Sequence, residues 1–246
     1  MVTGAAQGMG LAIAKALYRE GARVLLMDVN PGAVTAAAKE IDPSGSRAVG
    51  RRGDVSRPEE VQALVKELKA LWGTVDILVN NAGGALHTPH VLEEIQEKDW
   101  NLVVDVNLKG TFLCCRAVIP EMARQGKGVI VNMSALAGHW RASLAGVQYV
   151  AAKAGVEGLT RQLAYDWGKS GIRVNAVAPT VVLTPMGTRV WGDPQKADPV
   201  KAKIPLGRFA QPREVTSAVL FLASEQAGMI HGDTLIIDGG VNAKLY

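Results

Sequence analysis

The chain has 246 residues and a formal net charge of +4 at pH 7, from basic and acidic residues scattered along it. No run approaches the roughly 20 consecutive apolar residues that cross a bilayer, and no basic stripe with interleaved aromatic residues occurs. Neither a membrane span nor nucleic-acid binding is therefore expected. The start lacks the pattern of a secretory signal, and Cys114 and Cys115 are adjacent in an apolar helical pattern, where a mutual disulfide would be strained. We expect one domain over residues 1–246 in the reducing cytoplasm, with no metal site.

Short runs rich in Val, Ile and Leu alternate with longer stretches of helical period. The expected strands are Arg23–Asp28, Ala48–Gly50, Val75–Asn80, Val129–Met133, Arg173–Ala178 and Thr234–Asp238. The expected helices are Leu11–Glu20, Pro58–Trp72, Asp99–Gln125, Tyr149–Lys169 and Pro212–Ala223. This alternation predicts right-handed βαβ units and an α/β fold, a Rossmann-type doubly wound parallel sheet with helices on both faces.

One segment, residues 184–208, breaks this alternation. It contains four prolines and shows no clear period. Long irregular connections in compact domains are often lids or binding loops. We expect this segment to be a substrate lid.

Three glycines, Gly4, Gly8 and Gly10, fall in the first ten residues, just before an apolar run of helical spacing. In a doubly wound sheet the first strand-to-helix turn holds the pyrophosphate of a dinucleotide. Glycine lets backbone N–H groups approach phosphate oxygens at the helix N-terminus. A glycine-rich turn without a ligand is the alternative. Only Met1–Thr3 precede Gly4, so the first strand is expected to be short or to lack its beginning.

The glycine spacing is Gly-x-x-x-Gly-x-Gly rather than the more familiar Gly-x-Gly-x-x-Gly. Further motifs follow in order: Asn80-Asn81-Ala82-Gly83, Asn107, Ser134, Tyr149-x-x-x-Lys153, Pro179 and Asp238-Gly239-Gly240. With these residues the sequence resembles the short-chain dehydrogenase/reductase family over essentially its whole length, including its 3-oxoacyl reductase-like and sugar or polyol dehydrogenase members. The resemblance implies a nicotinamide cofactor, a small alcohol or ketone substrate and a homotetramer.

Asp28 ends the second expected strand, 18 residues beyond Gly10. A carboxylate there would accept hydrogen bonds from the adenosine ribose and repel a 2′-phosphate, which favours NAD over NADP. Capping of the next turn toward Pro31 is the alternative role of Asp28. The resemblance also implies adenine contacts from Asp54 and Val55, and it places Asn81, Ala82 and Gly83 at the adenosine side. The residues expected to bind NAD are Gly4, Gln7, Gly8, Met9, Gly10, Asp28, Asp54, Val55, Asn81, Ala82, Gly83, Tyr149, Lys153, Pro179, Val182 and Thr184.

Tyr149 and Lys153 are four residues apart, so a helix places them on one face. A phenol ionises near pH ~10, and lowering that pKa to ~7 needs more than an exposed ion pair supplies, so we expect a partly dry cleft. There Tyr149 would exchange a proton with the substrate oxygen while hydride passes between substrate carbon and nicotinamide.

The resemblance implies three further roles at this centre. Lys153 would bind the nicotinamide ribose, Ser134 would bond the substrate oxygen, and Asn107 would anchor a water that relays protons from Lys153. The structural alternatives are a cap for Ser134, helix bending for Asn107 and packing for Tyr149.

The spacing from Ser134 to Tyr149 is longer than the family's usual one, which indicates an insertion in the loop 136–148. The candidates for substrate recognition are His87, Trp140, Arg141 and Trp191, with ordinary loop positions as the alternative. Arg141 in the pocket would pair a carboxylate or phosphate of the substrate. A neutral pocket for a polyol or cyclic alcohol is equally open.

The favoured function is NAD-dependent oxidation or reduction at a secondary alcohol or ketone of a sugar, polyol, hydroxy acid or cyclic alcohol. A 3-oxoacyl thioester reductase is the alternative within this class. Epimerisation or dehydration with retained NAD is another possibility. A non-catalytic NAD-sensing or scaffold protein is disfavoured, because Tyr149 and Lys153 are both present.

Overall fold

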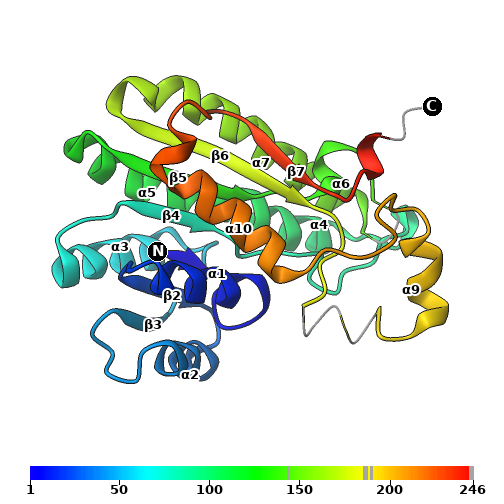
Figure 1. Cartoon of the computed structure of the whole chain (residues 1–246), viewed down its shortest axis with the longest axis horizontal. Coiled ribbons are helices and arrows are strands. Elements are labelled where there is room, and N and C mark those ends of the chain that lie inside the picture. The colour runs from blue at the N-terminus through cyan, green and yellow to red at the C-terminus, as the bar shows by residue number, and fades with distance from the viewer. Residues whose placement is uncertain (143–144, 185–187, 189–190, 244–246) are drawn as a thin grey trace.

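The computed structural model describes residues 1–142, 145–184, 188 and 191–243. Within them, seven parallel strands form one sheet in the order β3-β2-β1-β4-β5-β6-β7 (Figure 1). The strands are β1 (Val2–Thr3), β2 (Val24–Asp28), β3 (Ala48–Arg52), β4 (Ile77–Asn80), β5 (Gly128–Met133), β6 (Ile172–Pro179) and β7 (Thr234–Ile237). The order reverses between β1 and β4, which is the topology of a doubly wound Rossmann-type sheet, as predicted.

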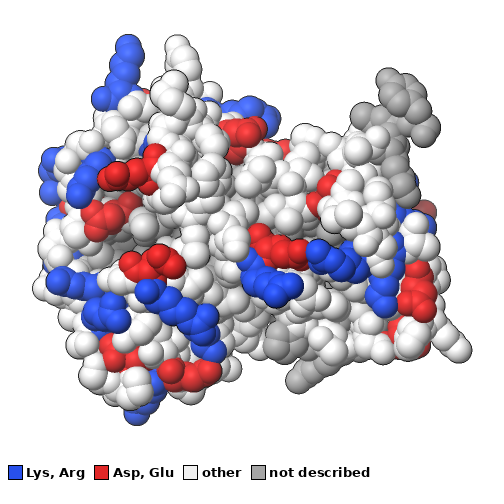
Figure 2. Space-filling model, viewed as in Figure 1, with Lys and Arg blue, Asp and Glu red and all other residues white. Residues whose placement is uncertain are grey.

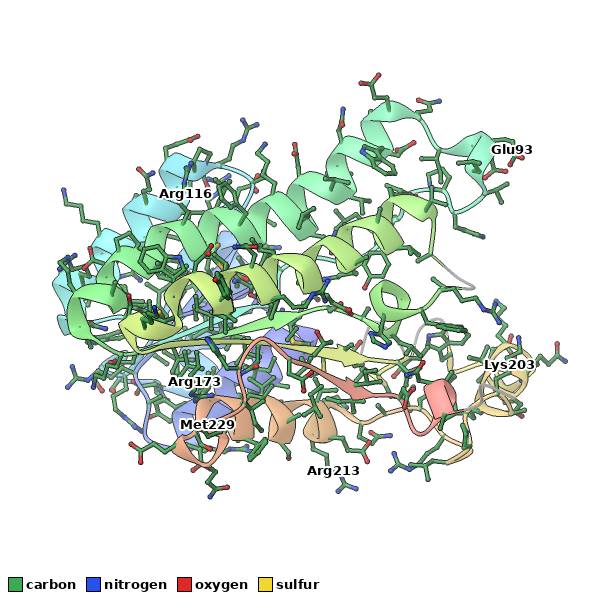
Figure 3. All side chains as sticks on the ribbon, turned by 90° about the horizontal axis from the view of Figure 1, so that it is seen from above. Glu93, Arg116, Arg173, Lys203, Arg213 and Met229 are labelled. Carbon is green, nitrogen blue, oxygen red and sulfur yellow. The ribbon has the colours of Figure 1, made fainter. Side chains whose placement is uncertain are left out.

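Helices cover both faces of the sheet, so that the strands lie between two helical layers (Figure 3). The helices are α1 (Gly8–Arg19), α2 (Pro31–Ile41), α3 (Pro58–Trp72), α4 (Glu97–Val104), α5 (Gly110–Gln125), α6 (Leu136–His139), α7 (Val147–Trp167), α9 (Pro194–Lys201) and α10 (Pro212–Ala223). Helices α3, α5 and α7 pack on one face with Leu25 and Met27, and helices α1, α2 and α10 pack on the other with Val24 and Leu26. This alternation follows from the period of two in a strand, and it buries strand residues on both faces.

Strand β1 is short but central. Val2 pairs with Leu26 of β2 and with Val79 of β4, and Thr3 pairs with Met27. Because parallel strands place their carboxyl ends at one edge, the turn after β1 lies between the ends of its two neighbours.

Two differences from the expected helices have local causes. Helix α2 was not predicted, because its apolar residues are mostly alanines; it begins with Pro31, after the Asn30 side chain that accepts from Ala33 N at 3.0 Å. The expected helix Asp99–Gln125 is interrupted by the π-helical turn η2 (Asp105–Lys109). Such turns are frequent at functional sites, and η2 contains Asn107.

The segment 184–208 is more ordered than its lack of periodicity predicts. Helix α9 lies within it, and the Asp193 side chain caps that helix by accepting from Gln195 N at 3.0 Å. Ile204 and Phe209 are buried beside α9 in a small cluster of their own. The prediction that this stretch is irregular was therefore wrong for α9.

A buried polar ladder links the centre of the sheet to α7. Asn80 Nδ2 donates to Asn132 Oδ1 at 2.9 Å across the paired strands β4 and β5, and Asn132 Nδ2 donates to Thr160 Oγ1 at 2.9 Å. Cys115 lies beside Asn80 on α5, and burial raises the pKa of its thiol to about 12. Cys114 and Cys115 are free and buried, which agrees with their predicted packing role.

The surface mixes both signs of charge. On the face shown in Figure 2, lysines and arginines lie among aspartates and glutamates. In the part of the chain that the structure describes, no helix has the length and apolarity needed to span a bilayer.

Candidate active site

The predicted site residues gather at the carboxyl edge of the sheet. The glycine-rich turn follows β1, Asp28 ends β2, Asn81–Gly83 follow β4, Ser134 follows β5 and Pro179 ends β6. Open α/β sheets bind their ligands at this edge, near the reversal of strand order.

The glycine-rich turn has a backbone that favours glycine. Gly4 and Gly8 have φ of 62° and 59°, and a Cβ added to Gly8 would meet nothing within 4 Å. A Cβ on Gly10 would lie 2.1 Å from the Gly4 carbonyl oxygen, so α1 packs directly on the turn. The open approach at Gly8, where α1 begins, fits a phosphate at the helix N-terminus.

Thr3 and Asn81 hold this turn against the end of β4. Thr3 Oγ1 accepts from the N–H groups of Asn81 and Ala82, both at 3.0 Å. Asn81 Nδ2 donates to the carbonyls of Thr3 and Gly4, also at 3.0 Å. A Cβ on Gly4 would lie 2.8 Å from Ala82 Cα, so the two turns touch. Thr3 is not among the residues predicted for the site, although it directly precedes the first glycine.

Asp28 is attached to the same turn. Its Oδ2 accepts from Ala6 N at 3.1 Å, and its Oδ1 accepts from Asn30 N at 3.1 Å. The carboxylate therefore orders the turn toward Pro31 and also lies beside the glycine-rich turn. Each oxygen keeps a further lone pair for ribose hydroxyls, so these residues fit a dinucleotide.

The two residues expected at the adenine have structural partners of their own. Asp54 Oδ1 accepts from Ser56 N at 2.8 Å and from Ser56 Oγ at 2.7 Å, which closes the turn before α3. Val55 is buried, and a Cβ on Gly110 would lie 2.6 Å from Val55 Cγ2. Adenine contacts from Asp54 and Val55 stay predictions.

Tyr149 and Lys153 lie on one face of α7, as their spacing predicts. Lys153 Nζ is buried, lies 5.7 Å from the ring centre of Tyr149 and donates to the Met133 carbonyl at 2.7 Å. A Cβ on Gly83 would lie 3.4 Å from Lys153 Nζ and 2.3 Å from Asn107 Oδ1. Residues from α7, from η2 and from the ends of β4 and β5 therefore converge at Lys153.

Burial disfavours charge on both reacting side chains. It raises the pKa of Tyr149 to about 12 and lowers the pKa of Lys153 to about 8. The expected lowering of the phenol pKa by Lys153 is not found in the protein alone, where burial raises the pKa of Tyr149.

Asn107 is fully buried, and both ends of its amide form hydrogen bonds. Oδ1 accepts from Gly84 N, and Nδ2 donates to the carbonyls of Gly84 and Val103, each at 2.9 Å. The amide thus fixes the loop after β4. The Asn107 carbonyl accepts from Thr111 Oγ1 at 2.8 Å and retains a second lone pair, so the expected water at Asn107 stays a prediction.

Ser134 is buried beside Lys153 and bonds to a residue that the sequence analysis missed. Its Oγ donates to Glu157 Oε1 at 2.9 Å and lies 3.2 Å from the Lys153 carbonyl oxygen. The Ser134 hydroxyl is therefore directed to α7, and its expected hydrogen bond to a substrate oxygen stays a prediction. The signal for Glu157 was its position four residues after Lys153, on the same face of one helix.

His87 lies in an exposed turn held by a second missed residue, Gln148. Leu86 and His87 have φ of 54° and 57°, in the left-handed region that such side chains rarely adopt. Gln148 Nε2 donates to Thr88 Oγ1 at 3.0 Å and to the Pro89 carbonyl at 2.9 Å. Gln148 is buried, and its place directly before Tyr149 was the available signal.

The other substrate candidates divide into two groups. Trp140 and Arg141 are exposed and follow α6. Trp191 packs on Phe209 with ring centres 5.4 Å apart, inside the small cluster beside α9, so packing accounts for its side chain. Substrate contacts from all four candidates stay predictions.

The segment after β6 runs beside the loop that precedes α10. Val182 pairs with Ala210, and Leu183 N donates to the Ala210 carbonyl at 2.9 Å. Pro179, Val182 and Thr184 thus leave the sheet at the edge that carries the site, and their cofactor contacts stay predictions.

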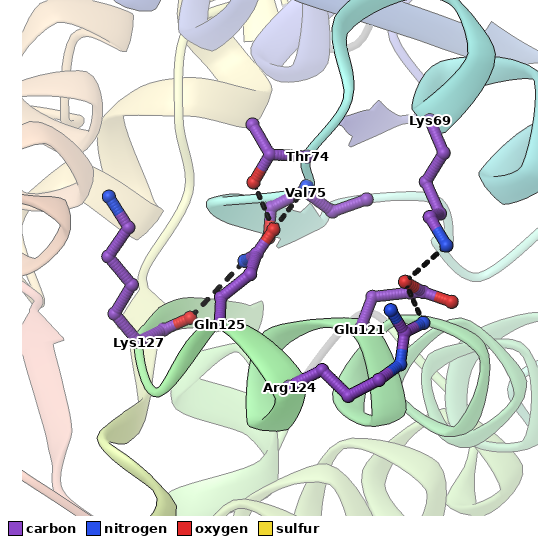
Figure 4. Close-up of polar contacts among 7 residues, drawn as sticks. All are labelled: Lys69, Thr74, Val75, Glu121, Arg124, Gln125 and Lys127. Atoms are coloured by element: carbon purple, nitrogen blue, oxygen red, sulfur yellow. Dashed lines mark hydrogen bonds and ion pairs between the residues drawn. The ribbon is translucent and has the colours of Figure 1, made fainter.

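Two hollows lie at the opposite edge, near the amino ends of the strands. One of about 390 Å³ is lined by Trp72 and Val75, and one of about 730 Å³ by Arg173 and His231, among others. Arg173 and His231 bond to neighbouring backbone, and Gln125 bonds Thr74 and Val75 at the same edge (Figure 4).

Among the described residues, no group of three or more His, Cys, Asp or Glu side chains is placed to hold a metal ion.

Comparisons with known proteins match this architecture. A family model described as enoyl-(acyl carrier protein) reductase covers residues 4–242. D-threitol dehydrogenase of Mycolicibacterium smegmatis is 43% identical over 99% of this chain and 92% of its own. NAD-dependent glycerol dehydrogenase of Listeria innocua is 39% identical over 99% and 93%, and a 3-oxoacyl-[acyl-carrier-protein] reductase of Chlamydia muridarum is 38% identical over 98% and 96%.

A solved structure, that of an actinorhodin polyketide ketoreductase with NADPH, superimposes with a TM-score of 0.91. It is 35% identical and covers 98% of this chain and 95% of its own. The chain belongs to the short-chain dehydrogenase/reductase family, whose members are oxidoreductases that use a nicotinamide cofactor on secondary alcohols and ketones.

Proposed function

We propose that the protein is an NAD-dependent dehydrogenase that oxidises a secondary hydroxyl of a small polyol or sugar. The observation that carries the proposal is the convergence of Tyr149 and Lys153 beside Gly83, at the edge where Asp28 is attached to the glycine-rich turn. The relatives named for threitol and glycerol oxidation support the polyol class.

In this reaction a secondary alcohol and NAD⁺ give a ketone, NADH and a proton. The bound cofactor would supply the hydride acceptor and a positive charge beside the phenol. Tyr149 takes the hydroxyl proton at its phenol oxygen, acting as the general base. The Lys153 ammonium, 5.7 Å from the ring centre, stabilises the phenolate and can bind the nicotinamide ribose. Gly83 leaves space beside Lys153 and Asn107, because a Cβ at this position would reach both side chains.

The choice of NAD rests on Asp28. Its carboxylate can accept from both ribose hydroxyls, and its charge would repel the 2′-phosphate of NADP. Gln7 in the turn, and Val29 and Asn30 after Asp28, supply no base for that phosphate. Because the similar ketoreductase was crystallised with NADPH, the preference of this protein for NAD over NADP has to be measured.

A 3-oxoacyl thioester reductase is the second candidate, and the similarity to an acyl-carrier-protein reductase favours it. Such an enzyme would run in the reductive direction, with Tyr149 as the proton donor. Its substrate would be a 3-oxoacyl thioester rather than a polyol. Residues 184–208, with α9, would form the lid over either substrate.

Assembly as a homotetramer in the cytoplasm completes the proposal. Large apolar side chains are exposed on the outer faces of the helices beside the site: Trp100 and Leu102 on α4, Phe112 on α5, and Tyr165 on α7. An exposed apolar surface of this kind is typical of an interface. Sedimentation velocity tests the assembly, and a monomer at assay concentration would contradict it.

The function is tested by cofactor reduction with NAD and NADP in parallel, over polyols, sugars, hydroxy acids and cyclic alcohols, with ketone and 3-oxoacyl thioester reduction as the reverse assay. Tyr149→Phe is expected to remove turnover, whereas Tyr165→Phe, a matched change at an exposed tyrosine of the same helix, keeps it. Turnover of polyols with NAD supports the proposal. Turnover of thioesters alone selects the second candidate, and equal rates in Tyr149→Phe and the unmutated protein overturn both.

A further inference from the structure

Glu157 is a buried carboxylate that the proposed proton transfer does not use. It lies on α7, four residues after Lys153 and eight after Tyr149, so the three side chains share one face of the helix. Only 5% of Glu157 is exposed. A carboxylate so deeply buried is costly unless hydrogen bonds compensate for the lost hydration.

Its two oxygens contact both sides of α6. Oε1 accepts from Ser134 Oγ at 2.9 Å, before α6, and Oε2 lies 3.4 Å from His139 Nδ1, at its end. Between them, Gly138 packs so closely on α7 that an added Cβ would lie 2.5 Å from the Lys153 carbonyl carbon. Glu157 therefore holds the segment from Ser134 to His139 against the backbone of Lys153.

The same segment fixes Lys153 itself. Met133, directly before Ser134, accepts from Lys153 Nζ at 2.7 Å, and Ser134 Oγ reaches the Lys153 carbonyl at 3.2 Å. The end of β5 and the catalytic helix are thus tied together at Lys153. Trp140 and Arg141, two of the substrate candidates, follow directly from this fixed base.

We propose that Glu157 is a positioning residue of the reacting centre, which acts through Ser134 and His139 and turns the Ser134 hydroxyl toward α7 instead of toward the substrate. The proposal rests on the proposed dehydrogenase function. In this role Ser134 is a positioning residue as well, because the two nearer acceptors of its single hydrogen, at 2.9 and 3.2 Å, are on α7, whereas the Ala135 carbonyl is 3.5 Å away.

Glu157→Leu removes the acceptor, whereas Glu157→Gln keeps an amide oxygen for Ser134 and an amide N–H for His139. Displacement of reacting groups by about 1 Å costs up to about 100-fold, so Glu157→Leu is expected to lower kcat/KM for the alcohol about 10- to 100-fold. Glu157→Gln is expected to retain most activity. The dissociation constant of NAD, measured by fluorescence, should change less than kcat/KM does, because most of the residues proposed to hold the nucleotide lie on other elements.

Hydrogen–deuterium exchange supplies a readout besides activity. The amides of Gly138 and Trp140 bond to the carbonyls of Ala135 and Leu136, and their exchange should accelerate in Glu157→Leu but not in Glu157→Gln. The matched control is Glu121→Gln on α5, whose carboxylate pairs with Lys69 and Arg124 at the opposite edge of the sheet (Figure 4). This control should change neither kcat/KM nor the exchange of α6.

The decisive comparison is the double variant Ser134→Ala/Glu157→Leu. If Ser134 acts through Glu157, the double variant is no worse than Glu157→Leu alone. A further loss on removing Ser134 would show that its hydroxyl contacts the substrate, and it would overturn the proposal. Unchanged kinetics and exchange in Glu157→Leu, or equal losses in the Gln and Leu variants, would overturn it too.

Failure of the proposed function would be visible separately. Absence of turnover in the unmutated protein, on every substrate and with both nucleotides, would reject the dehydrogenase, while the exchange of Gly138 and Trp140 would still decide whether Glu157 holds α6. Should Glu157→Leu not fold, Glu157→Ala, which also removes the acceptor of Ser134, takes its place in the same comparison with Ser134→Ala.

Discussion

The ammonium of Lys153 lies 5.7 Å from the ring centre of Tyr149 and donates to the Met133 carbonyl rather than to the phenol oxygen. Both groups are held in a dry environment, which lowers the pKa of Lys153 to about 8 and raises that of Tyr149 to about 12. Burial therefore makes the charged form of each side chain unfavourable in the protein alone. A positive charge beside the phenol oxygen, which an oxidised nicotinamide would supply, would offset the cost of ionising Tyr149.

The cost at Lys153 predicts a pH-dependent stability difference from Lys153→Met. Below pH 8 the lysine is protonated in both states and the full penalty, about 3 kcal/mol, opposes folding. Between about pH 8 and 10.5 the unfolded state binds more protons than the native state, so the unfolding free energy of the unmutated protein rises with pH. Lys153→Met should be the more stable protein at pH 7, by up to about 3 kcal/mol, and its advantage should shrink toward pH 10.5.

Urea denaturation at several pH values checks this, with Lys169→Met at an exposed lysine as the control. Tyr149 changes the pH dependence in the opposite direction, since its raised pKa makes the unfolding free energy fall above about pH 10. This contribution is the same in the unmutated protein and in Lys153→Met, so it cancels from their difference. A difference that stays constant from pH 7 to 10.5 would contradict the prediction. Turnover by Lys153→Met should be lost at every pH.

The sequence predicts the helices well where the apolar periodicity and the residues typical of helix ends agree. Helices α3 and α10 begin and end at the predicted residues, because each combines a periodic apolar face with a proline at its first position. Helix α2 escapes detection because small alanines give little contrast between its faces. The π turn at Asn107 leaves no signal in periodicity, since it changes the hydrogen bonding and not the residue pattern.

At the site, the sequence identifies residues but not their partners. Tyr149 and Lys153 follow from helical spacing, and the glycines from the turn that they require. The bond between Ser134 and Glu157 joins residues 23 apart on a strand end and a helix, so only the packing of α7 on β5 reveals it. The contact between Gln148 and Thr88 depends in the same way on the tertiary fold.

Asp28 is predicted to decide the choice of nucleotide. Asp28→Ser should lower kcat/KM for NAD about 10- to 100-fold, because charge-assisted bonds to the ribose are lost. Adding Val29→Arg should raise the value for NADP, since an arginine there pairs the 2′-phosphate. Parallel kinetics with both nucleotides measure the ratio, and Glu20→Gln at the exposed end of α1 is the control. A ratio unaffected by Asp28→Ser would remove the basis for NAD preference.

Gly83 is predicted to admit no side chain. A Cβ there would lie 2.3 Å from Asn107 Oδ1 and 3.4 Å from Lys153 Nζ, so Gly83→Ala should displace both and lower kcat about 100-fold. Gly84→Ala is a matched control, because Gly84 has a similar φ of 140° but its nearest neighbour, Leu86 N, is 4.0 Å away. Both variants carry backbone strain of about 1–2 kcal/mol, and only Gly83→Ala adds the collision. Equal kcat values in the two would show that strain, and not the collision, limits the site.

Gln148 is predicted to set the affinity for substrate through the turn that carries His87. Its Nε2 holds Thr88 and the Pro89 carbonyl, while its Oε1 is buried without a partner among the described residues. Leu86 and His87 keep left-handed backbones that cost about 1–2 kcal/mol each, so the turn should relax once Gln148→Ala releases it. The expected result is a KM for the alcohol about tenfold higher, with a smaller change in kcat and an unchanged KM for NAD.

Gln162→Ala is the matched control for that experiment, since Gln162 lies on the same helix, is exposed, and bonds only Asp166 at 2.8 Å among the contacts described. Initial rates at saturating NAD over a range of alcohol concentrations separate KM from kcat. If Gln148→Ala lowers kcat and leaves KM unchanged, the turn does not contact substrate, and Gln148 acts on the adjoining Tyr149 instead. The same result would remove His87 from the residues expected to recognise the substrate, because its position depends on the turn that Gln148 holds.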